Sequence, residues 1–505
     1  MAATLDASVN QRFSTRLGFL LSVMGIAVGT VNIWRFPRIV AQNGSDAGAG
    51  AFLVAWTVFL FLWSIPLVLA EYAMGRKCRM GVVGTIAKIA GEKFAWMGAF
   101  MGFVTAAITF FYAVVLGWCL YYFVQTLIHP LPLTTEVAMT RWNDYQGSGW
   151  PLVTHAVVVG IGGFAIWRGI RSIERINKIL IPTLLVIVLI SVIRGLTLPG
   201  AWAGVVYLFT PEWGQLSSPK IWMEALTQNA WDVGAGWGLY LTYAAYVKRE
   251  HGVVKNGFLT PIGNNLVSML AALMVFSTVF AVLRTEMGMM QTEVLEIMRN
   301  SGLASTGLTF IWMPQLFARM LFGRPLAILF FLGLTFAGFS SLIAHLELST
   351  RVLIDAGLKR PRAIVIVTVV IYCLGVPSAI SLNVLKNQDF VWGYALMISG
   401  ALAALAVARY GASRLRKEEL LADENDWKLG RWWDVVLVGF VPLAAMTLLI
   451  WWLVKEAQPG TWYNPLDPTS VMNCLVQWFV VLTILLFTGR WLARRSLKNS
   501  LSNSS

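Results

Sequence analysis

Residues 25–37 have the sequence Gly25-Ile26-Ala27-Val28-Gly29-Thr30-Val31-Asn32-Ile33-Trp34-Arg35-Phe36-Pro37. They lie inside an apolar segment of membrane-spanning length, which glycines and polar residues interrupt. A second interrupted stretch, residues 228–238, has the sequence Gln228-Asn229-Ala230-Trp231-Asp232-Val233-Gly234-Ala235-Gly236-Trp237-Gly238. The two stretches together decide the expected fold.

Glycine alone is weak evidence for a break, because small residues also let membrane helices pack closely. The polar neighbours are stronger evidence: Asn32 and Arg35 accompany the first glycine group, and Gln228, Asn229 and Asp232 accompany the second. A charge at the bilayer centre costs at least about 2.5 kcal/mol, so such residues usually face a cavity and mark an ion or substrate path. We therefore expect two membrane helices that are unwound near their centres.

The composition places the whole chain in a membrane. Its 505 residues have a mean hydropathy of +0.67 and are 57% hydrophobic and 13% charged, whereas soluble domains carry about 25% charged residues. Four isolated cysteines exclude a disulfide scaffold. A net charge of +14 does not indicate nucleic-acid binding, because Lys and Arg occur in short clusters between apolar runs. Residues 1–14 are polar and resemble no signal peptide.

Twelve segments are long and apolar enough to cross a bilayer, which takes roughly 20 residues per helix. They are 17-40, 51-75, 96-127, 152-168, 177-194, 222-247, 262-283, 325-354, 363-380, 389-410, 434-454 and 472-492. The loops on the side of the termini hold 28 Lys and Arg and the other loops hold 9, and Arg35 and Arg38 complete the total of 39. Because basic loops stay in the cytoplasm, we expect cytoplasmic termini and a location in the cell (inner) membrane.

The broken segments occupy corresponding places in the chain. They are the first and sixth spans, and so begin two five-helix units, 1 to 5 and 6 to 10. Interrupted helices at matching positions indicate an inverted-repeat transporter with its site at the midplane. In the long connection from Arg284 to Arg324, the apolar stretch 303–322 contains Gly307 and Pro314, so we expect a re-entrant or capping element there rather than a span.

Several motifs resemble the neurotransmitter:sodium symporter family, whose members share the LeuT fold. They occur in family order and are Arg16-Leu17-Gly18-Phe19, Ala27-Val28-Gly29, Asn32-Ile33-Trp34-Arg35-Phe36-Pro37, Ile65-Pro66-Leu67 with Glu71 and Gly75-Arg76, Phe111-Tyr112 with Gly117-Trp118, Leu198-Pro199-Gly200-Ala201, Gln228, Thr242-Tyr243 with Tyr246, Ala337-Gly338-Phe339-Ser340-Ser341, and Asp389-Phe390. The set covers residues 12 to 493 and is specific for the family, but much less so for the substrate.

The resemblance implies an all-α polytopic membrane protein with twelve transmembrane helices, a 5+5 inverted repeat and unwound helices 1 and 6. The chain would divide into a cytoplasmic segment (1-16), the transport core (17-410), helices 11 and 12 (411-493) and a cytoplasmic tail (494-505). The family takes up amino acids or related amines with sodium by alternating access, in which helices one, two, six and seven move against three, four, eight and nine. The lack of a long, cysteine-paired second outer loop favours a prokaryotic member.

The resemblance also implies binding of sodium, at two sites, and no organic cofactor. One site would use the carbonyls of Gly25, Val28 and Ala337 with the hydroxyls of Ser340 and Ser341. The other would use the Ala27 carbonyl, Asn32, Asp232 and Asn264. Oxygen ligands suit a hard cation, although Ser340 and Ser341 taken without the family would equally fit interhelical hydrogen bonds.

Position 29 indicates the class of substrate. By resemblance, transporters of amines that lack a carboxylate have Asp there, whereas Gly29 leaves room for a substrate carboxylate, which Tyr112 would bind. The rest of the predicted wall is Ile26, Thr30, Val31, Ile108, Trp231, Asp232, Gly234, Trp237, Ser341 and His345. The indoles favour a flat or aromatic side chain. Alternatively, each indole only packs and His345 only bonds a neighbouring carbonyl, and Val31 replaces a family glycine.

Two gates follow from the same resemblance. Arg35 and Asp389 match the outer pair. Asp355 matches the acidic half of the inner pair, but the usual basic position holds Asn10, which leaves Arg12 as a shifted candidate.

The sharpest departure from the family is Asp232, where most members have Thr or Ser. Chloride-dependent members hold chloride at positions that match Trp56, Gln228, Asp232, Asn264 and Ser268, and chloride-independent relatives have Glu at the Ser268 position. We expect the Asp232 carboxylate to replace chloride and to ligate sodium. If it titrates, it would carry protons outward. Alternatively it is a counter-ion for an amine substrate, or a structural carboxylate bonded to backbone amides.

Three functions remain open. The first is sodium-coupled uptake of a neutral, hydrophobic or aromatic amino acid, and the second is transport of a non-amino-acid amine or zwitterion by the same fold. The third, a receptor or membrane-embedded enzyme, would need degraded ion sites or a catalytic set. The sequence has no metal-ligand spacing, because its four histidines are widely separated, and it has no nucleophile elbow or phosphate loop. We therefore expect a transporter and not an enzyme, with a small molecule and the lipid bilayer as its partners.

Overall fold

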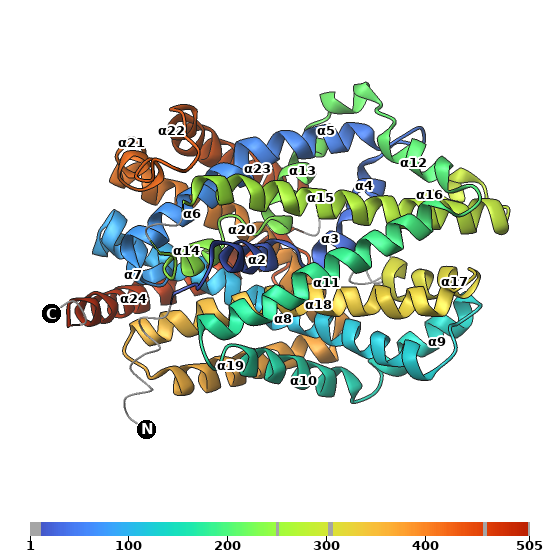
Figure 1. Cartoon of the computed structure of the whole chain (residues 1–505), viewed down its shortest axis with the longest axis horizontal. Coiled ribbons are helices and arrows are strands. Elements are labelled where there is room, and N and C mark those ends of the chain that lie inside the picture. The colour runs from blue at the N-terminus through green and yellow to red at the C-terminus, as the bar shows by residue number, and fades with distance from the viewer. Residues whose placement is uncertain (1–11, 249–251, 301–306, 458–461, 503–505) are drawn as a thin grey trace.

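The computed structural model describes residues 12–248, 252–300, 307–457 and 462–502, and in these every regular element is a helix (Figure 1). The predicted all-α class is confirmed. Nine of the described helical segments are long and apolar enough to cross a membrane, and two bent helix pairs bring the number to eleven. The sixth predicted span is divided into two short helices, so the expected twelve helices are compatible with the structure.

The helices follow the predicted spans in chain order. The first half comprises α2 (Arg16–Ala27), α3 (Thr30–Trp34), α4 (Phe36–Asn43), α5 (Gly50–Phe59), η1 (Leu60–Ser64), α6 (Ile65–Cys78), α8 (Ala95–Ile128), α10 (Trp150–Ala165) and α11 (Ile170–Leu196). The second half comprises α13 (Pro219–Asp232), α14 (Leu239–Ala244), α15 (Val254–Val279), η4 (Phe280–Glu286), α18 (Gly323–Asp355), α19 (Arg360–Ile380), α20 (Leu382–Tyr410), α22 (Trp432–Val435), η8 (Val436–Phe440), α23 (Val441–Glu456) and α24 (Val471–Ser502).

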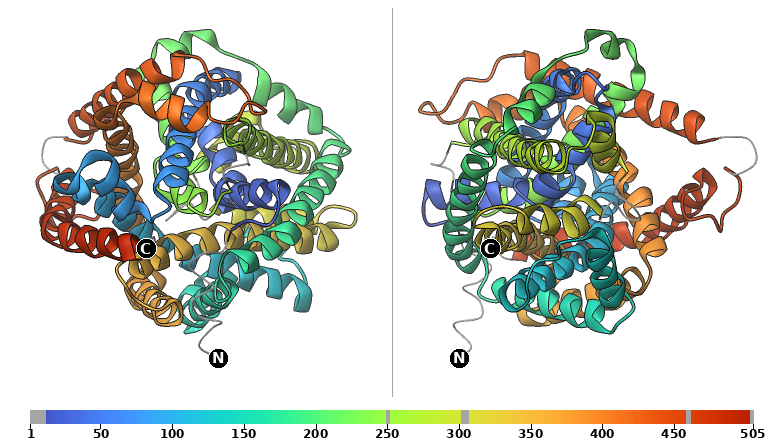
Figure 2. Two further views of the ribbon diagram at one scale, coloured as in Figure 1. Left: turned by 60° about the vertical axis from the view of Figure 1, so that its left-hand side comes forward. Right: turned by 90° about the vertical axis from the view of Figure 1, so that its right-hand side faces the viewer.

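The first predicted break lies where expected. Helix α2 ends at Ala27, and Val28 and Gly29 are extended before α3 begins, with a bend of 50° between the two parts. Figures 1 and 2 place this broken helix near the centre of the bundle, surrounded by the other helices. Its carbonyls and amides at the break therefore face protein rather than lipid, as unwound backbone within a membrane must.

The second break separates α13 from α14 and depends on three glycines. Gly234, Gly236 and Gly238 have φ of 72°, 90° and 81°, a region that residues with a Cβ rarely adopt. The Glu71 carboxylate on α6 accepts hydrogen bonds from the backbone N–H of Gly236 (2.7 Å) and Leu241 (3.1 Å). One side chain thus satisfies amides on both sides of the turn into α14.

The two ends of the bundle differ in character. The described chain ends lie at one end, and we call the opposite end, which carries α9 (Thr135–Gln146), α12 (Ala201–Phe209), α16 (Gln291–Arg299) and α17 (Met313–Ala318), the distal end (Figure 1). The predicted re-entrant stretch 303–322 begins outside the described residues. From Gly307 it forms η6 (Gly307–Trp312) and α17, six residues each, which are too short to cross a bilayer.

Some element boundaries differ from the prediction. Helix α11 begins at Ile170 and α24 continues to Ser502, so both extend beyond the apolar segments into polar sequence. The predicted tail 494-505 is helical as far as the structure describes it. The short helices α7 (Val82–Ala90), α9, α12, α16 and α21 (Ala412–Leu415), with η2 (Glu92–Phe94), η3 (Trp213–Ser217) and η7 (Arg416–Leu420), were missed, because a rule based on 20 apolar residues detects only spans.

Candidate functional site

A small cavity lies between the two breaks. It is lined by Ile26, Ala27, Gly29, Val31, Tyr112, Trp231, Asp232, Gly234, Trp237, Leu239, Ser341 and His345. Its volume is about 20 Å³, which is room for about one water molecule. The structure therefore represents a closed form in which the side chains of the site meet one another.

Four aromatic side chains, from three helices and the second break, make the apolar wall. Trp231 meets Trp237 edge to face at 5.6 Å between ring centroids, and Trp237 and Tyr112 each lie 5.4 Å from the His345 ring. The Trp237 indole N–H donates to the Ala230 carbonyl at 2.8 Å. That hydrogen bond joins the break to α13, so Trp237 is fixed in position as well as packed.

Gly29 brings backbone close to two hydroxyls. A Cβ at this position would lie 2.7 Å from Ser341 Oγ and 3.2 Å from Tyr112 Oη, so a larger residue would displace both. Tyr112 Oη also accepts a hydrogen bond of 3.3 Å from Thr30. The backbone of the first break and the hydroxyls of Ser341 and Tyr112 therefore surround the same small volume. This arrangement of groups suits a substrate carboxylate.

Most of the predicted wall residues line the cavity, but Thr30 and Ile108 do not. Thr30 is buried one residue beyond Gly29 and reaches only Tyr112, and Ile108 is buried within α8. Leu239 was missed, although its place directly after the glycine-rich turn was a signal available in the sequence. Ala27, predicted only as an ion ligand, also lines the cavity.

The first predicted sodium site is brought together. The Ser340 hydroxyl lies 2.9 Å from the Ala337 carbonyl oxygen and 3.2 Å from that of Val28, and the Ser341 hydroxyl lies 3.3 Å from the Gly25 carbonyl oxygen. Five oxygens thus converge from α2, its break and α18. This all-oxygen set without a full charge fits a hard cation such as sodium.

The second predicted sodium site is also assembled. The Asn264 side-chain oxygen lies 2.9 Å from the Ala27 carbonyl oxygen and 3.2 Å from the Asp232 carbonyl oxygen. Three acceptors this close need either a cation among them or the amide turned so that its nitrogen donates. Asn32 donates 2.7 Å hydrogen bonds to Asn264 and to Ser268, and its own Oδ1 accepts one of 2.7 Å from the Gly29 N–H. The oxygens of Ala27, Asp232 and Asn264 are the ones that fit sodium here.

The Asp232 carboxylate belongs to this second cluster. Its Oδ2 accepts a 2.9 Å hydrogen bond from Ser268, whereas its buried Oδ1 has no hydrogen-bond partner within the described chain. Both amide atoms of buried Gln228 and the indole N–H of Trp56 also lack partners there. Of the residues matched to the family chloride site, Ser268 donates to this carboxylate, and the Asn264 side chain lies 3.2 Å from the Asp232 carbonyl oxygen.

Asn229 is the exception among the polar residues of the sixth span. Its amide donates to the carbonyls of Trp56 (2.9 Å) and Ala225 (3.0 Å), and it accepts from Ser64 at 3.1 Å. The bonds to Trp56 and Ser64 tie α13 to α5 and η1, and the bond to Ala225 lies within α13, so Asn229 is structural.

The two residues of the predicted outer pair lie in contact. Arg35 Nη1 lies 3.8 Å from Asp389 Oδ1, with side-chain exposures of 15% and 40%. The Arg35 guanidinium also lies 4.8 Å from the ring centroid of Trp231, a wall residue. Arg35 therefore contacts both a wall residue of the cavity and Asp389.

The predicted inner pair is not formed between Arg12 and Asp355. Arg12 is exposed, and Asp355 instead binds Arg351 at 2.8 Å and accepts from the Gly81 amide at 2.5 Å. The reason is local: Arg351 is four residues before Asp355 on the same helix, a spacing that favours ion pairs. Asn10, the usual basic position, lies outside the described residues.

A different carboxylate holds the start of α2. Glu174 on α11 accepts hydrogen bonds from Ser14 N (2.8 Å), Ser14 Oγ (2.5 Å) and Thr15 Oγ1 (3.2 Å), and it pairs with Lys178 at 2.7 Å. A Cβ at Gly18 would overlap Glu174, so the close approach requires glycine there. Sequence reasoning used the basic loops only to assign topology and missed this contact.

Comparison with known proteins places these features in one group. A model of the sodium:neurotransmitter symporter family matches residues 10–149 and 140–496. An uncharacterized sodium-dependent transporter of Methanocaldococcus jannaschii is 30% identical over 458 residues, covering 87% of this chain and 89% of the relative. The sodium-dependent serotonin transporter of Drosophila melanogaster is 27% identical over 515 residues, covering 92% and 80%. The solved structure of MhsT in complex with L-phenylalanine matches with a TM-score of 0.74 at 26% identity, covering 87% of this chain and 99% of that one.

Proposed function

Because the chain belongs to the sodium:neurotransmitter symporter family, we propose that it takes up a neutral, hydrophobic or aromatic amino acid with sodium by alternating access. Its homologues are sodium-dependent transporters and not enzymes, and its fold is the LeuT-type fold shared with MhsT. The family uses sodium and a small-molecule substrate. What the proposal adds is the substrate class, the number of ions and the role of Asp232.

The surroundings of Gly29 carry the substrate proposal. The Tyr112 and Ser341 hydroxyls meet beside the unwound backbone, where a carboxylate would find both hydrogen-bond donors and the amides of the break. No acidic side chain fits at position 29 in this form, whereas the opposite wall is formed by Trp231, Trp237 and His345. An α-amino acid with an apolar or aromatic side chain matches both the hydrogen-bonding groups near Gly29 and the aromatic wall. MhsT, bound to L-phenylalanine, is a structural neighbour consistent with this choice.

The two separate oxygen clusters support the binding of two sodium ions. Ser340 and Ser341 would hold one ion with the carbonyls of Gly25, Val28 and Ala337. Asn264 would hold the other with Asn32, Asp232 and the Ala27 carbonyl. When bound, each ion supplies positive charge at an unwound helix, so ion and substrate carboxylate favour one another. The chain contributes the fixed oxygens and excludes water.

Asp232 supports chloride independence. Its carboxylate occupies the cluster with Ser268 and Asn264, and a fixed negative charge there would repel chloride while balancing sodium. The protein therefore needs no mobile anion to neutralise its ions.

The orientation proposal rests on charge. Basic loops gather at the end of the bundle that holds the described chain ends, and this end would face the cytoplasm of a cell whose inner membrane the protein spans. In that orientation the Arg35–Asp389 pair closes the outer path. The helices of the two breaks would move with their neighbours against the remaining scaffold.

One observation favours a second function, the transport of an amine. Asp232 itself lines the cavity, so its carboxylate could pair with the ammonium group of a substrate that lacks a carboxylate. The relative from Drosophila melanogaster is a serotonin transporter, which fits that alternative.

Binding to purified protein separates the two functions. Thermal stability is measured with neutral amino acids or with the matching decarboxylated amines, in sodium or in potassium, since a ligand of the native state raises the melting temperature. We expect stabilisation by L-phenylalanine or a similar amino acid in sodium alone. Stabilisation by phenethylamine, with none by phenylalanine, would establish the amine alternative. Ligand binding that is equal in sodium and potassium would contradict the proposed ion coupling.

A further inference from the structure

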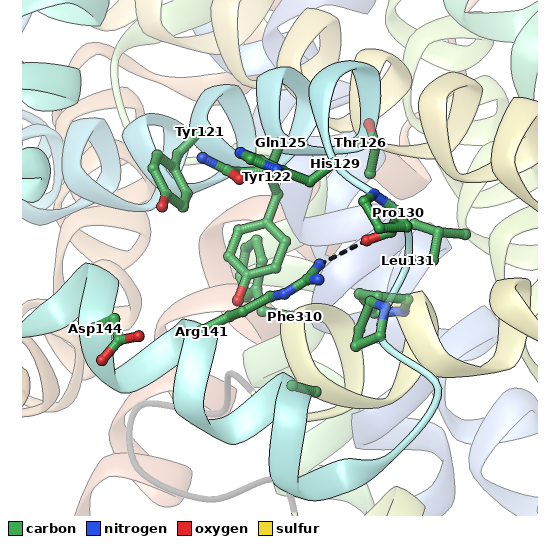
Figure 3. Close-up of a pocket in the computed structure, with 13 residues that line it drawn as sticks. Tyr121, Tyr122, Gln125, Thr126, His129, Pro130, Leu131, Arg141, Asp144 and Phe310 are labelled. Atoms are coloured by element: carbon green, nitrogen blue, oxygen red, sulfur yellow. Dashed lines mark hydrogen bonds between the residues drawn. The ribbon is translucent and has the colours of Figure 1, made fainter.

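An arginine lies in a different setting at each end of the bundle. At the distal end a pocket of about 230 Å³ lies among the end of α8, the following loop, α9 and the segment of η6 and α17. Arg141 of α9 is partly exposed on its wall and, as Figure 3 shows, donates to the carbonyl of Pro130 in that loop. At the opposite end, which holds the described chain ends and which we call the chain-end side, Arg351 of α18 is buried. A buried guanidinium needs its partners among the helices around it.

Arg351 forms an ion pair within its own helix. Its Nε lies 2.8 Å from Asp355 Oδ1, one turn further along α18, and each side chain is only 8% exposed. Asn499 of α24 donates to the Asp355 carbonyl at 3.0 Å, which places the pair beside the described C-terminal residues. The carboxylate predicted to bind an N-terminal arginine is therefore already paired.

The same guanidinium also connects α18 to two other spans. Arg351 Nη2 donates to the Arg79 carbonyl at 2.9 Å, and Arg79 directly follows α6. The guanidinium carbon lies 5.1 Å from the ring centroid of Tyr246, just beyond α14. A guanidinium over a tyrosine ring is attracted to the ring face, most strongly where water is excluded. Arg351 therefore joins α18, the eighth span, to the ends of the second and sixth spans.

Tyr246 extends this connection to the first span. Its carbonyl accepts a 3.2 Å hydrogen bond from the Phe13 N–H, just before α2, and its hydroxyl donates to Glu347 of α18 at 2.7 Å. Asp355 makes a parallel contact, because its Oδ2 accepts from the Gly81 N–H at 2.5 Å. Three spans thus converge, directly or through Tyr246, on the ion pair of α18.

The predicted N-terminal partner is placed less favourably. Arg12 is exposed, and an exposed ion pair contributes little to stability. Arg351 is instead closely packed, since a Cβ at Gly81 would lie 3.1 Å from both Arg351 Cγ and Asp355 Oδ2. Contacts of a charge that is shielded from water in this way are stronger.

We propose that Arg351 holds the chain-end side of the transport path closed, in the role predicted for an N-terminal arginine. The inference rests on the proposed function, in which the first, second, sixth and seventh spans move against a scaffold that contains the eighth. Arg351 lies on the eighth span and contacts the second and the sixth, so the path opens on this side only when these contacts separate. Arg351 is a positioning residue, because it acts through Arg79 and Tyr246 rather than on the substrate.

The test measures how fast maleimide labels a cysteine at position 22 in the full-length protein in lipid nanodiscs with sodium. Ser22 is fully buried on α2, between the start of this helix and the first break. The reporter protein carries Ser22→Cys and Cys373→Ser, which removes the exposed native cysteine. Mass spectrometry assigns the label to each residue, and native Cys119, buried in α8, reports any general loosening of the fold.

We expect Arg351→Gln to raise the labelling rate of residue 22 at least about fivefold, because it removes the charge from a buried hydrogen bond and from the ring contact. Arg351→Lys keeps the charge and should raise the rate less. Arg362→Gln, an exposed arginine on α19, is the matched control and should leave the rate unchanged. Arg12→Gln should also leave it unchanged.

A second position keeps the test decisive if Arg351→Gln does not fold. Tyr246→Leu removes the ring beneath the guanidinium and should raise the labelling rate, whereas Tyr246→Phe keeps the ring and should raise it less. Combined with Arg351→Gln, Tyr246→Leu should have a smaller effect than it has alone, because both changes remove the same contact.

Each contrary outcome overturns the proposal. Faster labelling after Arg12→Gln, with none after Arg351→Gln, would assign the closure to the N-terminal arginine. Rates that are the same in all variants would show that these contacts do not hold the path closed. Labelling of Cys119 together with residue 22 would show that Arg351 only stabilises the fold. Labelling requires no substrate, so its result is independent of whether phenylalanine or an amine stabilises the protein.

Discussion

The Ser268 hydroxyl donates a 2.9 Å hydrogen bond to Asp232 Oδ2, and it accepts one of 2.7 Å from Asn32. A side chain of α15 therefore links the carboxylate at the end of α13 to the first break. The carboxylate is part of an ordered polar cluster rather than an isolated charge. This position lets Asp232 act on sodium and on any anion that would approach the cluster.

Transport should need no chloride. With chloride replaced by gluconate, we expect sodium-dependent uptake to be unchanged, because Asp232 supplies the negative charge. Asp232→Ser should make uptake chloride-dependent, whereas Glu212→Ser in an exposed loop should not. Strict chloride dependence of the unmodified protein would rule out this role.

Ser340 and Ser341 should both be required for sodium coupling. Replacing both with Ala removes two of five converging oxygens, and a desolvated cation cannot lose two ligands without a large loss of affinity. We expect sodium-dependent uptake to be abolished while expression is retained. Ser349→Ala, on the same helix and bonded only to the His345 carbonyl, is the control. Undiminished uptake by the double variant would remove the proposed site.

The outer pair should matter more for transport than for binding. Asp389→Ala removes an attraction that helps to close the site, which for a partly exposed pair is worth up to about 1 kcal/mol. We expect uptake to fall up to about fivefold while sodium-dependent binding changes little. Asp46→Ala, which removes the exposed pair with Arg299, is the control. If binding is lost and the remaining uptake is in proportion, Arg35 and Asp389 do not form a gate.

Glu174 should hold the start of α2 closed. Glu174→Gln removes a charged acceptor of the Ser14 and Thr15 hydrogen bonds, each worth about 1.5–3 kcal/mol. In a protein with Cys373→Ser and Ser22→Cys, we expect maleimide to label residue 22 at least severalfold faster after this change. Arg175→Gln, exposed on the same helix, should leave the rate unchanged. Equal rates in all three proteins would assign Glu174 a purely structural role.

Much of the site was predictable because membrane interiors tolerate few polar groups. Asn32, Arg35 and Asp232 stand out against apolar sequence, and the structure places all three around the breaks. The positions of the breaks followed from the glycines beside them. Polar residues that are costly to place inside a bilayer can therefore be recognised from the sequence alone.

The remaining features depended on how helices face one another. Thr30 and Ile108 do not line the cavity, because which face of a helix meets a cavity is set by packing and not by residue type. Asp355 pairs with Arg351. The four-residue spacing indicates this pair, but the family resemblance led us to expect a partner near the N-terminus instead. The contact between Glu174 and Ser14 joins residues 160 positions apart, so no local pattern indicated it.

The Glu71 contacts have a kinetic consequence. Because a carboxylate of α6 already satisfies the amides of Gly236 and Leu241, the interruption of the sixth span exists before any ligand arrives. The turn lacks the backbone hydrogen bonds that a continuous helix would form. These bonds are lost once, when the protein folds, and need not be broken again in each transport cycle. Ligand arrival then requires no local unwinding step, and the speed of each cycle is left to the motions of whole helices.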